Sequence, residues 1–158
     1  LDIAESNLES GRTNIREALK LVREVGMAFI GPAVLAACAT LTNDSKQRLI
    51  YLQEAEQVLD SGCVSHNHFH FAQTAIELCL QAKDWDSVEH YALRLEAYTA
   101  DQPLEWSDFI IARGRILVAS GKGETGSHIS CELERLYAQG KQAGLRRTLV
   151  KLKDAKMT

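Results

Sequence analysis

The clearest pattern in this sequence is AQTAIELCLQAKDWDSVEHYALRL, residues 72–95. Its first half is a dense apolar segment that runs into the polar turn Asp84-Trp85. Beyond the turn, four apolar side chains recur every three or four residues and share one helix face: Val88, Tyr91, Ala92 and Leu95. Two helical segments joined by so short a turn predict an antiparallel helix hairpin.

Similar polar turns recur along the chain and indicate a repeat. They are centred on Gly11-Arg12, Asn43-Asp44, Asp84-Trp85 and Gly121-Lys122, at intervals of about 32 to 41 residues. These intervals are close to the period of about 34 residues that is typical of tetratricopeptide repeats. Because single hairpins of this kind cannot bury their apolar faces, they stack side by side. We therefore predict an all-α fold of tetratricopeptide-like antiparallel hairpins, stacked as a right-handed superhelix.

The apolar periodicity and the residues that favour helix ends predict eight helices. They cover Asn14–Val25, Pro32–Thr42, Ser45–Leu59, His66–Lys83, Asp86–Thr99, Pro103–Ser120, Gly126–Gly140 and Leu145–Ala155. Asp86 with Glu89 is predicted to form a capping box. Ser45 is predicted to cap its helix, and Pro103 to lie in the first turn of the next, where its missing N–H is not needed.

The composition is that of an ordinary globular protein, with 46% hydrophobic residues, 25% charged residues and a formal charge of −3. So small a charge gives no reason to expect nucleic acid or a membrane surface as partner. The nearly uncharged stretch from Met27 to Asn43 contains Pro32 and is too short to span a bilayer. Four scattered cysteines without CxxC spacing are expected to be reduced, which points to the cytoplasm: Cys38, Cys63, Cys79 and Cys131.

Four blocks of the sequence carry a resemblance to a known protein family. They are GMAFIGP (residues 26–32), GCVSHNH (62–68), DWD (84–86) and WSDFIIARGR (106–115). Their order resembles the C-terminal helical-repeat region of bacterial proteins that join a class III adenylate or guanylate cyclase domain, a P-loop ATPase module and tetratricopeptide-like repeats. The likeness spans about residues 26 to 123.

The resemblance implies a cytoplasmic signalling protein whose full-length parent is a nucleotide cyclase, while this region has no catalytic residues and no cofactor of its own. Residues 1–158 are expected to form a single repeat domain cut from a longer chain. Residues 1–9 would end a truncated repeat, and residues 145–158 would form a C-terminal capping helix. The implied partner is a protein or peptide, which includes the upstream domains of the parent chain.

The strongest candidate for partner binding is an aromatic and cationic stripe. Trp106, Phe109 and Arg113 share one helix face at a spacing of three and four residues. Tryptophan beside arginine is typical of the residues that contribute most to protein interfaces. The same composition suits a contact between neighbouring repeats, in which Asp108 pairs with an arginine. A binding role requires that Trp106 be partly exposed.

A second candidate is the cluster at the predicted start of the fourth helix. Cys63, His66 and His70 are candidate zinc ligands, with His66 and His70 on one helix face; His66 and His68 are also candidates for partner binding. The alternative is an ordinary helix start, because Asn67 stands where a zinc protease would carry its catalytic glutamate. We expect no metal in this region, and keep a metal site as an alternative hypothesis.

Motifs for catalysis or nucleotide binding are incomplete. The run Gly121-Lys122-Gly123 lacks the Ser or Thr that follows the lysine of a P-loop, and no GxSxG motif occurs. We therefore predict a non-catalytic interaction or regulatory region. The remaining alternative is the ligand-sensing repeat domain of a bacterial transcription activator related to the maltose regulator.

Overall fold

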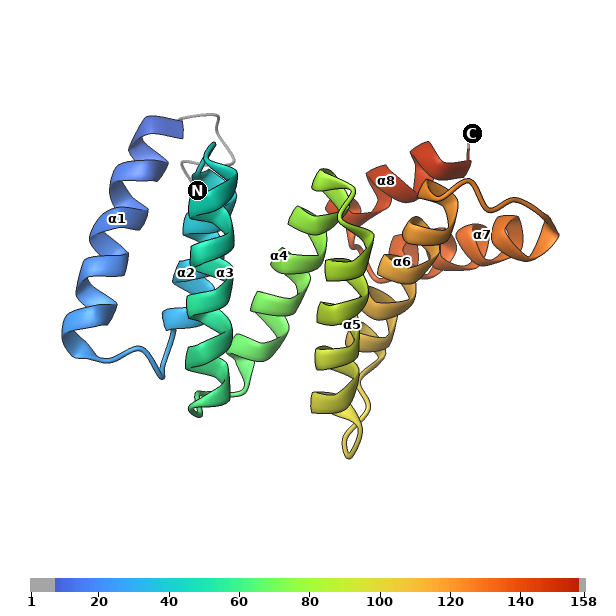
Figure 1. The fold of residues 1–158 in the computed structure, drawn as a ribbon. Helices are drawn as coiled ribbons and strands as arrows, with labels where there is room; N and C mark the ends of the chain where they lie inside the picture. Colours follow the sequence, from blue (N-terminus) through green and yellow to red (C-terminus); the bar gives the residue numbers. More distant parts are fainter. Residues whose placement is uncertain (1–7, 157–158) are drawn as a thin grey trace. The chain divides into compact units, whose positions relative to one another are not determined.

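The computed structural model describes residues 8–156, and every regular element in this range is an α-helix (Figure 1). The helices are α1 (Leu8–Val25), α2 (Gly31–Leu41), α3 (Ser45–Asp60), α4 (His66–Ala82), α5 (Trp85–Thr99), α6 (Glu105–Gly121), α7 (Ser127–Gln142) and α8 (Arg146–Lys156). The prediction of an all-α chain with eight helices is confirmed for these residues. No described helix is both long enough and apolar enough to cross a membrane.

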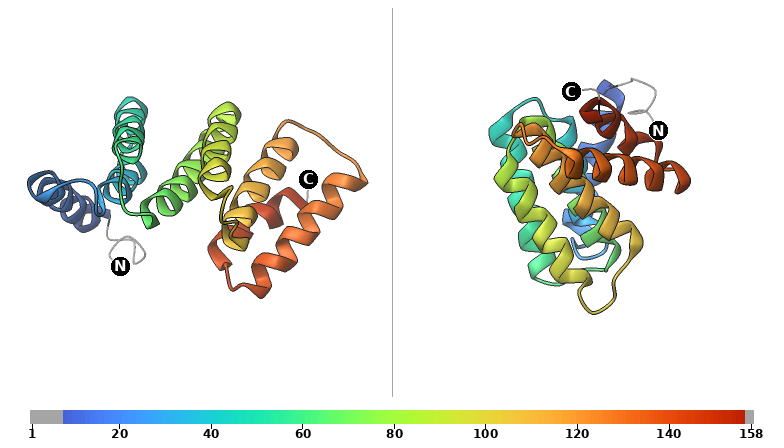
Figure 2. Two further views of the ribbon diagram at one scale, coloured as in Figure 1. Left: turned by 90° about the horizontal axis from the view of Figure 1, so that it is seen from below. Right: turned by 90° about the vertical axis from the view of Figure 1, so that its right-hand side faces the viewer.

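The contacts between helices divide the chain into two compact units, with the boundary inside α4 between Ala75 and Ile76. In the first unit α1 packs on α2, and α2 packs on α3. In the second unit α5 packs on α6, α6 on α7 and α7 on α8, and α8 also contacts α6. Figure 2 shows α6, α7 and α8 grouped together, from amber to red. Contacts between consecutive helices are those of stacked hairpins.

In the first unit, α2 is the central helix because it is apolar along almost its whole length. Leu35 and Ala39 are completely buried between α1 and α3, and Pro32 occupies the first turn. The next helix, α3, is capped by Asp44, whose carboxylate accepts a hydrogen bond of 2.8 Å from the backbone N–H of Lys46. The cap satisfies an N–H group that has no partner within the helix.

The start of α4 is fixed to the turn between α1 and α2 by a buried amide. Asn67 is fully buried, and its Nδ2 donates hydrogen bonds to the carbonyl oxygens of Phe29 at 2.9 Å and Val64 at 3.1 Å. The backbone N–H of Val64 also donates to the carbonyl of Ala28 at 3.0 Å. Since a buried amide without partners would be costly, these bonds make Asn67 a structural residue.

The second unit depends on glycines where helices pass closely. A Cβ on Gly114 would lie 3.3 Å from Cγ2 of Ile76, and one on Gly121 would lie 2.7 Å from Cη2 of Trp85. These positions allow α6 to approach its neighbours more closely than any side chain would permit. The same helix therefore forms the centre of the second unit.

Several details of the sequence prediction are wrong. Gly11 does not form a turn, because α1 begins at Leu8 and Gly11 is buried inside that helix. The cap of α5 is Asp84, which accepts from the N–H of Ser87 at 3.2 Å, rather than Asp86. Pro103 precedes α6 instead of lying in its first turn, since that helix begins at Glu105.

Most of the residues predicted to form the chain ends lie in α1 and α8. Of the truncated repeat expected over residues 1–9, residues 1–7 lie outside the described residues, and residues 8 and 9 belong to α1. Residues 146–156 form the helix α8, in which Leu152 is fully buried, and the role of this helix as a cap stays a prediction. The assignment of one repeat domain to residues 1–158 stays a prediction.

Candidate interaction surface

The second unit has a hollow of about 500 Å³ along α6, which we call the α6 groove. Its floor is a stripe of α6 in which residues recur every three or four positions, from Ile111 and Ala112 through Ile116 to Ala119. Ile129 of α7 completes the apolar floor. The spacing places these residues on one face of α6, which α5 and α7 border. Ile111 and Ile116 are nearly buried at the base of the groove, whereas Ala112 and Ala119 are half-buried.

Charged residues surround this floor. Four carboxylates line the groove, from α5, from the first turn of α6, from the connection between α6 and α7, and from α7: Glu96, Asp108, Glu124 and Glu132. The groove is also lined by the guanidinium of Arg115 and the imidazole of His128. The groove thus combines an apolar floor with a predominantly acidic rim.

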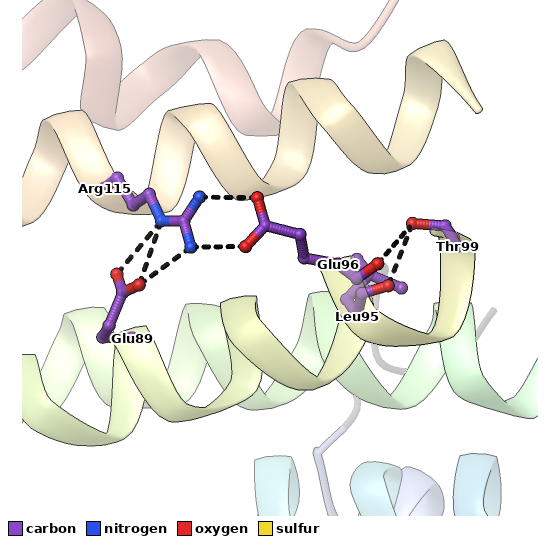
Figure 3. Close-up of polar contacts among 5 residues, drawn as sticks. All are labelled: Glu89, Leu95, Glu96, Thr99 and Arg115. Carbon is purple, nitrogen blue, oxygen red and sulfur yellow. Dashed lines mark hydrogen bonds and ion pairs between the residues drawn. The ribbon is translucent and has the colours of Figure 1, made fainter. Parts of the chain in front are cut away.

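The positive charge of Arg115 is shared between two glutamates of α5 (Figure 3). Its Nη2 donates to Oε1 of Glu89 at 2.8 Å, and its Nη1 and Nη2 donate to the carboxylate of Glu96 at 3.0 and 2.9 Å. The hydrogen bonds from Arg115 hold the pKa of the Glu96 carboxyl below its usual value, so Glu96 stays ionised. Figure 3 also shows Thr99, which donates to the carbonyl of Leu95 at 3.0 Å near the end of α5.

The other acids of the rim differ in how they are paired. Glu132 accepts hydrogen bonds from Arg135 at 2.7 and 2.8 Å, and these bonds lower the pKa of its carboxyl. For Asp108 and Glu124, no cationic group lies within ion-pair distance among the described residues. Both side chains are exposed. The groove therefore carries two acids whose charge is not neutralised locally.

A second hollow of about 510 Å³ lies beside Trp106 and Phe109, bordered by Gln139, Ala143 and Leu145. Trp106 is half-buried, which a role in partner binding requires, whereas Phe109 is only 2% exposed. A Cβ on Gly140 would lie 2.9 Å from the Phe109 ring, so this ring is held in the interior. Phe109 forms the base of the hollow, while Trp106 stands at its edge.

Arg113, the third residue of the predicted stripe, is 1% exposed. Its Nε donates to the carbonyl of Thr148 at 2.8 Å, and its Nη1 forms an ion pair with Glu77. Lys151 of α8 pairs with the same carboxylate at 3.0 Å. The guanidinium of Arg113 thus joins α6 to α8 and to the end of α4 inside the second unit, and its role in partner binding stays a prediction.

The histidine cluster lies in the first unit, at the start of α4. The His66 and His70 rings are 6.2 Å apart between centroids, and Phe29 lies edge-on to His66 at 5.8 Å. Cys63 is half-buried, and burial raises the pKa of its thiol. No three His, Cys, Asp or Glu side chains within residues 8–156 are grouped so that they could hold a metal ion. His68 is also half-buried.

Sequence reasoning missed the residues of the α6 groove. Ile111 and Ile116 were recognisable only as apolar helix residues, and the acids of the rim come from four separate segments. The signal that could have found the groove is the alternation of small and large apolar residues on α6, with Ala112 and Ala119 beside Ile116. Small residues on a partly buried stripe leave a depression between the flanking helices.

Comparison of the chain with protein-family models, with curated protein sequences and with solved structures gave no match. The described residues therefore establish an all-helical chain whose helices pack in consecutive pairs, without a family assignment.

Proposed function

We propose that this chain is a non-catalytic, tetratricopeptide-like region through which a multidomain signalling protein binds a protein or peptide partner at the α6 groove. The observation that carries the proposal is the groove itself. Its apolar floor, with Ile111 and Ile116, is surrounded by charged side chains, which is the arrangement of an interface with an apolar centre and a polar rim. Stacked helix hairpins present such surfaces for binding.

The ionisation of the groove carboxylates Glu96 and Glu132 supports binding over catalysis. General acids and bases usually need a pKa near the working pH. In the groove, the pKa values of Glu96 and Glu132 are both lowered, chiefly by hydrogen bonds from Arg115 and Arg135. Carboxylates whose pKa is lowered by ion pairs are suited to recognition and helix packing.

The resemblance of residues 26–123 to cyclase-linked repeat regions supports a regulatory role in a protein of the cyclase and ATPase type. In this proposal the partner includes the upstream domains of the parent chain. Occupation of the groove would then change the activity of those domains, because a ligand shifts an equilibrium toward the state that it binds better.

The proposal can be tested by site-specific photocrosslinking of the full-length protein in the cells that make it. A benzophenone amino acid at Ala112, on the groove floor, should crosslink to one defined segment of a partner or of the parent chain. The matched control is the same residue at Ala97, an exposed position of α5 that does not line the groove. Identical crosslinks from both positions, or none from Ala112, would contradict the proposal.

A further inference from the structure

We propose that the partner segment in the α6 groove is a basic amphipathic helix of about three turns, with cationic residues at both ends of its apolar face. This inference rests on the proposed function and names the chemistry of its partner. It follows from the length of the groove, from the position of its unpaired charges and from the surroundings of α8.

The length of the groove is set by α6. The lining stripe runs from Asp108 to Ala119, which corresponds to three turns of helix, or roughly 17 Å at 1.5 Å per residue. Its floor is mainly apolar: Ile111 and Ile116 are nearly buried at its base, and Ala112, Ala119 and Ile129 are half-buried and remain accessible to a partner. A partner helix of the same length can place apolar side chains on this floor at a spacing of three and four residues.

The unpaired charges lie at the two ends of this stripe. Asp108 belongs to the first turn of α6, and Glu124 follows Gly121, where α6 ends. Between them, Arg115 is already engaged by Glu89 and by Glu96. The groove therefore offers two free carboxylates separated by about three helical turns. Lysine or arginine residues at the same separation on a partner helix would meet both carboxylates.

The negative charge of the groove rim distinguishes basic partners from acidic ones. Phosphate-bearing polymers and acidic peptides would be repelled by Asp108 and Glu124, the two groove carboxylates without a cationic partner among the described residues, since Glu96 and Glu132 are paired with Arg115 and Arg135. A basic helix is attracted, and its cations fix the register in which its apolar face docks. Charge complementarity therefore favours a basic segment over a neutral or an acidic one.

The basic helix of this chain itself, α8, is not the occupant. It packs against α6 and α7 within the second unit, with Leu152 fully buried. The carbonyl of Thr148 accepts from Arg113, and Lys151 pairs with Glu77. Because these contacts already hold α8 in the core of the unit, the occupant must come from elsewhere.

The test uses the intact chain and a designed helical peptide of about 15 residues, with lysines three turns apart on either side of a leucine face. The comparison peptide carries glutamates in place of the lysines. Binding is measured by fluorescence anisotropy at low and at high salt. We expect the lysine peptide to bind and the glutamate peptide to bind at least tenfold more weakly, with the difference shrinking as salt screens the charges.

Two double variants locate the contacts. Asp108→Asn with Glu124→Gln removes both free carboxylates without a change of shape, and should weaken binding of the lysine peptide about tenfold, which is roughly 1.4 kcal/mol. Asp101→Asn with Glu105→Gln removes the same charge from exposed positions outside the groove, and should leave binding unchanged. Equal binding by both double variants would overturn the inference.

A third variant separates this inference from the proposed function. Ala112→Trp fills the groove floor and should abolish binding of the lysine peptide while the circular dichroism spectrum stays helical. If both peptides bind equally and Ala112→Trp abolishes both, the basic partner is wrong and the interaction groove stands. If neither peptide binds, the inference is overturned, and photocrosslinking from Ala112 decides the proposed function separately. Self-association that the Asp108→Asn/Glu124→Gln variant abolishes would assign the groove to a second copy and also overturn the inference.

Discussion

Arg115 of α6 and Glu96 of α5 face each other in a bidentate ion pair, with Nη1 to Oε1 at 3.0 Å and Nη2 to Oε2 at 2.9 Å. Glu89, about two turns earlier on α5, accepts from the same guanidinium. One arginine thus joins two turns of the neighbouring helix, and it does so at the border of the α6 groove. Planar guanidinium groups suit such paired contacts better than ammonium groups.

Replacement of Arg115 by Gln should lower the free energy of unfolding by about 1 kcal/mol, because the ion pairs are partly exposed and screened by solvent. The measurement is urea denaturation at neutral pH. As a control, Lys20→Gln breaks a more exposed pair with Glu24 at 3.9 Å and should change the stability by less. A larger effect of Lys20→Gln would contradict this assignment.

The same ion pair predicts a pH dependence. The pKa of Glu96 lies below its ordinary value of 4.5 in the folded chain, chiefly because of the hydrogen bonds from Arg115. Its stabilising effect is therefore complete above pH 4.5 and is lost as the pH falls through the folded-state pKa. The stability difference between wild type and Arg115→Gln should be constant from pH 7 to about pH 5 and shrink below it. A difference that grows on acidification would contradict this.

Replacement of Arg113 by Met should lower the free energy of unfolding by about 3 kcal/mol. The substitution removes a buried charge from the ion pair with Glu77 and removes the Arg113 hydrogen bond to the carbonyl of Thr148. Arg135→Met, at an exposed pair with Glu132, is the matched control and should have an effect of about 0.5 kcal/mol. Chemical denaturation of both variants distinguishes the buried from the exposed arginine.

Replacement of Asn67 by Leu should destabilise the first unit by about 2 kcal/mol, because the amide donors to Phe29 and Val64 are lost from a fully buried site. Hydrogen exchange provides a local readout. The N–H of Val64, which donates to Ala28, should exchange faster in the variant. Unchanged protection at Val64 would show that the turn is held by other contacts.

The cysteines should react with thiol reagents in an order set by exposure. Cys131 is exposed, whereas Cys38 and Cys79 are buried, and burial raises the pKa of the Cys38 thiol. A raised pKa reduces the fraction of reactive thiolate at neutral pH. We expect one fast phase with a chromogenic disulfide reagent, and Cys131→Ser should remove it. Persistence of the fast phase in that variant would refute the assignment.

The sequence was sufficient for the helices and for most of their ends. Regular apolar spacing predicted α3 within one residue at each end, and predicted α4 with the same start and an end one residue too late. The turn expected at Gly11 was wrong, because a single glycine inside a helix is tolerated where its small size suits the packing. Local chemistry alone does not distinguish that case from a helix end.

The site was less predictable for a physical reason. Trp106 and Arg113 lie on one face of α6, as their spacing requires, but spacing does not show how deeply each side chain is buried. Arg113 is buried because Glu77 and Thr148 supply its partners from helices that are distant in sequence. The groove acids come from several segments for the same reason. Such groupings depend on tertiary contacts, which helical periodicity does not encode.

The close approach of Gly121 to Trp85 has a consequence for recognising relatives of this chain. A methyl group at position 121 would overlap the indole, so the two positions should change together during evolution. A homologue with alanine or a larger residue at the first position is expected to carry a smaller side chain at the second. A paired change in side-chain size at positions 121 and 85 could therefore help identify distant homologues whose overall sequence identity is low.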